Sequence, residues 1–330
     1  MPDATIRDVA RRAQVSVATV SRALNGFENV SEQARERIAE AVSELGYVPH
    51  AGARSLSLAR TNAIGVVLPD LHGEFFSEIV RGMDREASRR GYLLLLSNLH
   101  SGREQATLAL KAMRGRVDGL IVMAPHLGAD DLAAALPNGF PSILINTRGA
   151  AGCFASIHVD NGAGARAVVD HFVAHGRKRL VHIAGPAGNI DAQERAAAFE
   201  SAASAHGVEW EIVRGDFEEQ SGEAAISALL AAGHRFDAVF AANDNMAIGT
   251  LHAIHSAGLR IPEDVAVAGF DDIPLARHLR LTTVRVRIAE LGERAFVRVL
   301  EALEGGDNAG DELHAPELLV RNTTYADCAD

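Results

Sequence analysis

The chain has 330 residues, 48% of them hydrophobic and 23% charged. This is an ordinary globular composition, with enough length for two or three domains. The formal net charge of −11 excludes a protein that coats nucleic acid with a uniformly basic surface. Residues 1–60 hold eight Lys and Arg against seven Asp and Glu, so a near-neutral head precedes an acidic body. A polyanion contact is therefore expected only at the head.

The sequence predicts a cytoplasmic protein. Cys153 and Cys328 lie far apart and match no zinc or redox spacing, which is typical of reduced thiols. A signal peptide would begin with charged residues followed by an apolar stretch, and the N-terminus shows no such pattern. The longest apolar runs, such as residues 92–96, are far shorter than the roughly 20 residues of a membrane helix.

Two short helices are predicted near the N-terminus. The first covers about residues 5–13, where Thr5 and Asp8 have the Thr-x-x-Asp form of a helix start and apolar residues follow at helical spacing. The second covers about residues 15–25, with Ser16 as its N-cap. Two short helices joined by a tight turn are typical of a helix-turn-helix, although two core helices of a bundle show the same pattern.

The second helix has one polar face, formed by Thr19, Ser21, Arg22 and Asn25, opposite an apolar stripe. Hydroxyl and amide groups bond phosphates, and an arginine bonds guanine edges. This face therefore favours a DNA contact in the major groove.

The string of residues 5–10, followed by residues 15–26, resembles the start of lactose-repressor (LacI/GalR) family transcription regulators. The resemblance implies a set of DNA contacts. They are Thr5, Ser16, Val17, Ala18, Thr19, Ser21, Arg22, Asn25, Ser31 and Leu56. Val17 and Ala18 stand where the family distinguishes operators; being apolar, they are expected to contact thymine methyls or read DNA shape. Gln14 stands in the turn where Gly is usual, which strains the backbone if its φ is positive.

The helix-turn-helix domain is predicted over residues 1–48, with a third helix that starts at Ser31 and stops at Gly46. Residues 49–60 form a linker or a hinge, and about nine helix-compatible residues there are too few for a stable isolated helix. In the family this segment is a hinge helix that folds on the operator. Leu56 then matches the leucine that is pushed into the minor groove, where a wedge kinks DNA at a cost of a few kcal/mol.

From residue 61 the sequence alternates apolar strands with amphipathic helices. The predicted strands are 64–68, 92–96, 120–123, 142–145, 157–159, 180–184, 238–241 and 265–268. The intervening helical patterns end at Gly91, Gly115, Gly176, Gly207, Gly233 and Gly258. Near-continuous apolar strands between helices predict an α/β fold with parallel sheets covered on both faces. About 270 residues exceed one such domain, so two lobes are expected.

This body also resembles the sensor of the same family, which is built like periplasmic sugar-binding proteins, with two lobes joined by three crossings. The resemblance predicts lobe 1 at about residues 61–159 and 289–318, and lobe 2 at about 160–288 and 319–330. The crossings are expected near residues 158–161, 285–289 and 316–321.

Polar and aromatic residues follow the strand ends, where ligands bind in open α/β sheets. Carboxylates, amides and one guanidinium around aromatic rings suit a polyhydroxylated ligand. By resemblance, the predicted effector contacts are His72, Phe75, Asn161, Arg195, Phe217, Asn243 and Asp271. Taken singly, each of these residues is equally well explained as a helix cap or a solvated loop. The neighbouring Asp244 is the clearest candidate for a helix cap.

Other patterns favour neither a cofactor nor catalysis. Gly162, Gly164 and Ala167 imitate a dinucleotide fingerprint, but the next strand ends without the acidic residue that holds a ribose. The pairs His171/His175 and His252/His255 lack further metal ligands. No Ser/His/Asp or Cys/His signature is visible. We therefore expect no cofactor, no metal and no enzyme.

Together these observations predict a homodimeric repressor of a near-palindromic operator, controlled by a small molecule bound between two lobes. A sugar or polyol is the expected effector, and a nucleobase is the alternative. The chain ends soon after residue 321 without a leucine heptad, so no tetramer-forming tail is expected. A solute-binding receptor without DNA function and an α/β enzyme are the rival classes.

Overall fold

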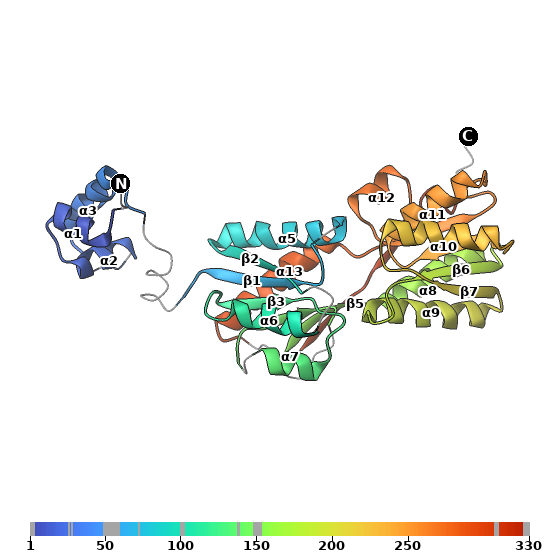
Figure 1. Cartoon of the computed structure of the whole chain (residues 1–330), viewed down its shortest axis with the longest axis horizontal. Coiled ribbons are helices and arrows are strands. Elements are labelled where there is room, and N and C mark those ends of the chain that lie inside the picture. The colour runs from blue at the N-terminus through green and yellow to red at the C-terminus, as the bar shows by residue number, and fades with distance from the viewer. Residues whose placement is uncertain are drawn as a thin grey trace. The chain divides into compact units, whose positions relative to one another are not determined.

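The computed structural model describes residues 4–25, 27, 29–48, 60–71, 73–99, 103–136, 139–147, 154–306 and 310–325 (Figure 1). The chain forms two compact units. One comprises residues 1–63 with 116–118, and the other comprises residues 64–115 with 119–330. The sequence-based prediction set the head at residues 1–48, a hinge at 49–60 and the body at 61–330.

The head is a three-helix unit of α1 (Ile6–Ala13), α2 (Val17–Leu24) and α3 (Glu32–Leu45). The buried core consists of Val9, Ala10, Ala13, Val20, Ile38 and Ala41. These residues recur at helical spacing, so each helix turns one stripe inward and leaves its polar face to solvent. α3 stops at Gly46, whose φ of 58° is the left-handed conformation expected there.

The first lobe of the body is a six-stranded sheet in the order β11-β5-β4-β3-β1-β2. Its strands are β1 (Ala63–Leu68), β2 (Leu93–Asn98), β3 (Gly119–Val122), β4 (Ser142–Ile145), β5 (Ala155–Val159) and β11 (Asp311–His314). β1, β3, β4, β5 and β11 pair in parallel. The helices are α5 (Glu74–Arg90), α6 (Arg103–Met113), α7 (Ala129–Ala135) and α13 (Ile288–Leu303), with α5 packed on α13 and α6 next to α7.

The second lobe repeats this architecture with a sheet in the order β12-β10-β9-β8-β6-β7. Its strands are β6 (Arg179–Ala184), β7 (Glu209–Arg214), β8 (Ala238–Ala241), β9 (Ala266–Asp271), β10 (Thr282–Arg285) and β12 (Glu317–Leu319). Its helices are α8 (Asn161–Ala174), α9 (Ile190–His206), α10 (Glu219–Ala231), α11 (Asp244–Ser256) and α12 (Pro274–His278). The α8/α9 pair and the α10/α11 pair cover opposite faces of this sheet (Figure 1).

Within its described residues, the chain passes between the two sheets three times: from β5 to α8, from β10 to α13, and from β11 to β12. The third crossing lies earlier than the sequence indicated. Glu317 and Leu318, which the sequence assigned to lobe 1, belong to β12 and pair antiparallel with β10. Ile288, assigned to lobe 2, begins α13 of lobe 1. An edge strand of three residues has no apolar run that marks its boundaries.

One strand contradicts the expectation of sheets covered on both faces. In β2, Leu93 is 72% exposed, and Leu95 and Leu96 are also exposed. β2 is the last strand of its sheet, so its position at the edge leaves these leucines uncovered within the chain.

Candidate functional site

The N-terminal end of α2 presents an exposed surface above the buried Val20. Val17 is 41% exposed, which is unusual for a valine in a small helical unit. Ala18 and Arg22 are exposed as well, while Thr19 and Ser21 are half-buried. The helix therefore offers small side chains and one guanidinium on its outer face, as a helix that enters a major groove must.

Several predicted DNA contacts also hold the helix ends together. The Thr5 hydroxyl forms a capping box with Asp8, at 2.6 Å between Oγ1 and Oδ2. The Ser16 hydroxyl accepts the backbone N–H of Thr19 at 3.1 Å. Asn25 donates to Ser21 Oγ at 3.5 Å. These bonds fix the side chains that flank the exposed surface.

Gln14 is the C-cap of α1, and Ser31 is the N-cap of α3. Ser31 is the N-cap of α3 and is exposed, but its side chain makes no cap hydrogen bond. Gln14 has φ 55° and ψ 45°, so the left-handed conformation anticipated for this turn is present without a glycine. Leu56 and His72, two of the predicted contacts, lie outside the described residues.

The predicted effector residues of the second lobe gather at the carboxyl ends of its strands. Asn161 begins α8, directly after β5. Phe217 follows β7, Asn243 follows β8, and Asp271 ends β9. Because parallel strands end at the same edge, residues more than a hundred positions apart come together here.

Arg195 on α9 is the centre of this group, although its guanidinium is almost fully buried. Its Nε donates to Asn161 Oδ1 at 2.8 Å, and its Nη1 donates to the carbonyl of Ala242. Nη1 also lies 3.7 Å from Asp271 Oδ1, and the guanidinium carbon lies 3.6 Å from the centre of the Phe270 ring. The cation is thus held in one position by a carboxylate, an amide and an aromatic face.

Asp191 is a member of the group that the sequence did not predict. Asn161 Nδ2 donates to Asp191 Oδ1 at 2.8 Å and to Glu194 Oε2 at 3.0 Å. Asp191 is 6% exposed, and burial raises the pKa of its carboxyl. It stands one helical turn before Arg195 on α9, so the i, i+4 spacing was the available signal.

Asp271 has an unusual backbone and an unusual acidity. Its φ is 111°, which is strained for a residue with a side chain. Burial raises the pKa of its carboxyl to about 7, against the opposing effect of Arg195 and with a smaller contribution from Asp191. The group therefore titrates near neutral pH.

Asn243 and Phe217 form a second pair along the same edge. Asn243 Nδ2 donates to the carbonyl of Phe217 at 2.8 Å, and its Oδ1 accepts the N–H of Met246. Asn243 is thus the N-cap of α11, not Asp244 as the alternative interpretation held. Asp244 is fully buried instead, where its carboxylate accepts bonds from the hydroxyl of Thr283 and the N–H of Ile273.

Phe75, another predicted effector contact, lies on α5 of the first lobe, whereas the residues described above lie at the strand ends of the second lobe. Its ring makes an edge-to-face contact with Phe76, with 5.4 Å between the centroids. Within the described part of the chain, no ring contact joins Phe75 to Arg195 or Asn161.

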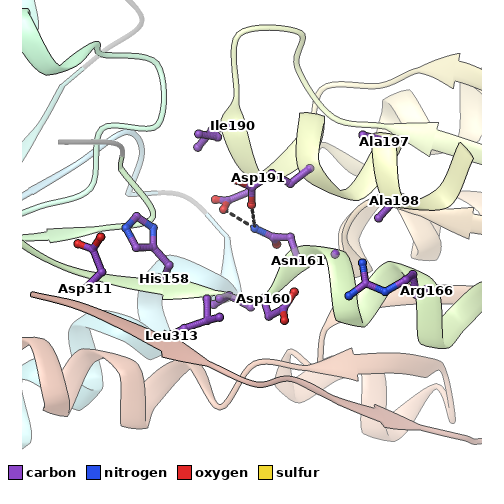
Figure 2. A pocket seen from close by; sticks show the side chains of 13 residues that line it. His158, Asp160, Asn161, Arg166, Ile190, Asp191, Ala197, Ala198, Asp311 and Leu313 are labelled. Atoms are coloured by element: carbon purple, nitrogen blue, oxygen red, sulfur yellow. Dashed lines mark hydrogen bonds between the residues drawn. The ribbon is translucent and has the colours of Figure 1, made fainter. Parts of the chain in front are cut away.

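A cavity of about 750 Å³ opens where β5 passes into α8. Asn161 and Asp191 face each other in its wall (Figure 2). Its lining residues are His158, Val159, Asp160, Asn161, Gly162, Arg166, Ile190, Asp191, Glu194, Ala197, Ala198, Asp311 and Leu313. Of the predicted effector residues that the structure describes, only Asn161 lines it. Arg195 donates to Asn161 and lies 3.7 Å from Asp271, so these two residues lie behind Asn161 in the polar network.

The remaining patterns have structural explanations. Asp160 caps α8 through the N–H of Ala163, at the position where a pyrophosphate would have to bind. His171 bonds the hydroxyl of Thr324, and its ring lies 4.3 Å from that of His175. Among the described residues, no group of three or more His, Cys, Asp or Glu could hold a metal ion. No described helix is long and apolar enough to cross a membrane.

A helix-turn-helix head joined to a two-lobed α/β body defines a class of regulatory proteins. Residues 5–50 match the model of bacterial regulatory proteins of the lacI family, and residues 169–324 match a periplasmic binding protein-like domain. The chain belongs to the LacI family and is a DNA-binding transcriptional repressor, not an enzyme.

Relatives match over almost the entire chain. The HTH-type transcriptional repressor CytR of Escherichia coli (strain K12) is 32% identical, covering 98% of this chain and 97% of that protein. The ribose operon repressor of Halalkalibacterium halodurans is 34% identical, with 97% of each covered. A crystal structure of the lac repressor dimer bound to operator and the anti-inducer ONPF superposes with a TM-score of 0.89 at 31% identity, covering 98% of this chain and 99% of that one.

Proposed function

We propose that two copies of this chain bind a near-palindromic operator and that a small molecule bound in the body controls the affinity. The observation that carries the DNA part is the exposed surface of α2, with Val17, Ala18 and Arg22 outward and Val20 fully buried. Arg22 bonds a guanine edge in the major groove, and Val17 contacts thymine methyls. Leu56 wedges the minor groove at the operator centre.

The homodimer is supported by uncovered apolar side chains on the first lobe. Leu93 on β2 is 72% exposed and Leu108 on α6 is 66% exposed, and β2 and α6 are in contact. Exposed apolar patches of this kind mark protein interfaces. The related lac repressor crystallised as a dimer on its operator. A symmetric dimer presents two α2 helices to successive half-sites.

A sugar or polyol is the effector class that we propose for the body. Arg195, Asn161, Asp191 and Asp271 supply paired donors and acceptors of the kind that hydroxyl groups need. A relative is named for the ribose operon, and a related structure is a complex with cellobiose. A nucleobase is the second candidate, because the half-buried Phe217 ring offers a stacking face.

The DNA-binding proposal is tested by Arg22→Ala in the full-length protein. An operator is first selected from a random DNA library, and affinities for it and for random DNA are then measured at one salt concentration. We expect the variant to lose about 1–3 kcal/mol of discrimination between the two. Arg89→Ala, which removes an exposed cation of the body, is the matched control and should leave discrimination unchanged.

Two results would contradict this proposal. If the wild-type protein selects no sequence above random DNA, it is not an operator-specific repressor. If Arg22→Ala weakens binding to operator and random DNA equally, Arg22 contacts only phosphate.

A further inference from the structure

Asp272 directly follows Asp271 at the end of β9, and its carboxylate is bonded by arginines from β10 and from the segment after β12. We propose that Asp272 is a positioning residue of the effector site, which holds Asp271 in its ligand-binding orientation through bonds to Arg285 and Arg321. Asp272, Arg285 and Arg321 are together called the Asp272 clamp below. This inference rests on the proposed role of Asp271 as an effector contact.

The backbone at this point has a conformation that residues with side chains rarely adopt. Asp271 has φ 111° and Asp272 has φ 58°, so two consecutive residues other than glycine lie in the positive-φ region. Such conformations are strained and persist only where the surrounding structure holds them in place. The bonds that the Asp272 side chain makes are the part of the surroundings that can hold this pair.

Each carboxylate oxygen of Asp272 has its own guanidinium. Arg285 Nε donates to Oδ2 at 2.8 Å, and Arg321 Nη2 donates to Oδ1 at 2.6 Å. Nη1 of Arg321 donates to the carbonyl of Leu281 at 2.7 Å, so this guanidinium is itself fixed. The Asp272 side chain is 12% exposed, which shields these charge-assisted bonds from water and salt. The carboxylate therefore cannot turn without breaking two short bonds.

The Asp272 clamp also joins Asp271 to the strands that lie next to two of the crossings between the lobes. Asp271 on β9 is the register partner of Arg285 on β10, and Arg285 is the register partner of Glu317 on β12. Arg285 Nη1 lies 3.8 Å from Glu317 Oε2. Arg285 ends β10 just before the chain enters α13, and Glu317 begins β12 just after the chain leaves β11. These three residues lie in one row of the sheet, so the backbone of Asp271 is held from the side of both crossings.

The carboxylate of Asp271 needs this support because its own ion pair is long. Arg195 Nη1 lies 3.7 Å from Asp271 Oδ1, which is beyond the distance of a hydrogen bond. Asp271 is nevertheless only 6% exposed. Its inward direction therefore follows from the backbone dihedral angles that the Asp272 clamp holds.

A mutant cycle in the ligand-free, full-length protein tests this positioning role. Burial raises the pKa of Asp271 to about 7, so Asp271→Asn changes how the free energy of unfolding depends on pH between about pH 4 and about pH 7. This free energy is measured by chemical denaturation for the wild type and for Asp272→Asn, each with and without Asp271→Asn. In the Asp272→Asn background we expect the pKa of Asp271 to fall by about one pH unit or more, because the released carboxylate reaches water. Asp191 and Asp244, whose pKa values are also raised, are present in all four proteins.

Two further backgrounds separate the position of Asp271 from the charge beside it. Arg321→Lys keeps the charge but cannot make both bonds of the guanidinium, so we expect the pKa of Asp271 to fall there as well. Asp237→Asn is the matched control. The Asp237 side chain is 20% exposed, accepts the backbone N–H of Arg179 at 3.0 Å, and directly precedes β8, at the other end of the strands of the same sheet. In this control background Asp271→Asn should have the same effect as in the wild type.

Several results of the cycle overturn the inference. If Asp271→Asn has the same effect in the wild type and in Asp272→Asn, Asp272 only stabilises the fold. If the pKa of Asp271 falls in Asp272→Asn but not in Arg321→Lys, the cause is charge and not position. If it falls as far in Asp237→Asn, any weakening of the lobe releases Asp271. If Asp272→Asn does not fold, Arg321→Lys decides alone.

Ligand binding separates this inference from the proposed function. Ribose, cellobiose and adenine are the probes, and thermal shifts of the full-length protein detect their binding. We expect a probe that binds the wild type to bind Asp272→Asn about tenfold more weakly, and to bind Asp237→Asn as tightly as the wild type. Equal affinity for the wild type and Asp272→Asn overturns the inference. If none of the probes binds but the pKa of Asp271 falls as expected, the proposed effector class fails and the positioning of Asp271 by Asp272 stands.

Discussion

At the scale of single residues, the candidate site depends on charges that are buried before any ligand arrives. Asp271 and Arg195 are each about 6% exposed and lie 3.7 Å apart, so neither is solvated by bulk water. Burial raises the pKa of both Asp191 and Asp271, and the single guanidinium of Arg195, which lowers both values, offsets only part of this rise. The stability of the body should therefore depend on pH near neutrality.

We expect Asp271→Asn to flatten this pH dependence in the ligand-free protein. Burial raises the pKa of Asp271 to about 7, while the unfolded chain has the model value of 3.8. Between these values the native state holds a proton that the unfolded state has lost, so raising the pH favours unfolding. The free energy of unfolding of the wild type, measured by chemical denaturation at each pH, should fall relative to that of the variant between pH 4 and pH 7, by at most about 1.4 kcal/mol per pH unit.

Asp264→Asn is the control for this experiment. The half-buried Asp264 carboxylate bonds Arg260, which lowers the pKa of Asp264 to about 2, so this carboxyl titrates below the pH range measured. The pKa values of Asp191 and Asp244 are also raised, so these acids contribute a pH dependence that both proteins share. If the curves of stability against pH for wild type and Asp271→Asn are parallel, Asp271 is ionised throughout the range and the prediction is wrong.

The residues of the site were predictable where strand ends marked them. Asn243 follows the apolar strand β8 after one residue, and Asp271 ends β9, whereas Arg195 was identified by family resemblance. Asp191 was missed because an acid in the first turn of a helix is ordinarily explained by the helix dipole. Only the packing of α8 against α9 reveals that this acid points inward and meets Asn161.

At the scale of elements, apolar runs predicted the central strands closely. The predicted 142–145 and 238–241 are the observed β4 and β8, and all six predicted glycine stops have positive φ. β7, β11 and β12 were missed because they are edge strands whose exposed faces carry polar residues. β10 was missed because buried threonines stand there in place of apolar residues. The backbone N–H of Thr282 donates to the hydroxyl of Thr323, and the hydroxyl of Thr283 donates to Asp244.

The turn between α1 and α2 gives a prediction at the same scale. Gln14 occupies the left-handed region, where a side chain costs about 1–2 kcal/mol that glycine avoids. Gln14→Gly should therefore stabilise the head by up to about 1 kcal/mol, because glycine gives back part of the gain as unfolded-state entropy. Slower hydrogen exchange at the Val9 and Val20 amides of the full-length protein would record it.

Gln33→Gly is the matched substitution in the interior of α3. Gln33 is exposed and has ordinary helical surroundings, so the same change should destabilise the head by about 1 kcal/mol and speed exchange. If both variants speed exchange, the left-handed strain at Gln14 is not what limits the stability of the turn.

At the scale of the whole molecule, the chain combines a helix-turn-helix head with a periplasmic binding protein-like body, and the effector control that we propose requires that the two be coupled. A ligand shifts DNA affinity only by the difference in its own affinity for the two states of the protein. Coupling free energies of this kind are typically about 1–3 kcal/mol. The linked equilibrium must also work in reverse, so operator DNA must change ligand affinity by the same factor.

The most direct test of this account is therefore a reciprocal titration of the full-length protein. Operator affinity is measured with and without the compound that stabilises the body, and affinity for that compound is measured with and without operator. We predict that both change by the same factor, about fivefold or more. Operator affinity that is identical with and without the bound compound would contradict the account.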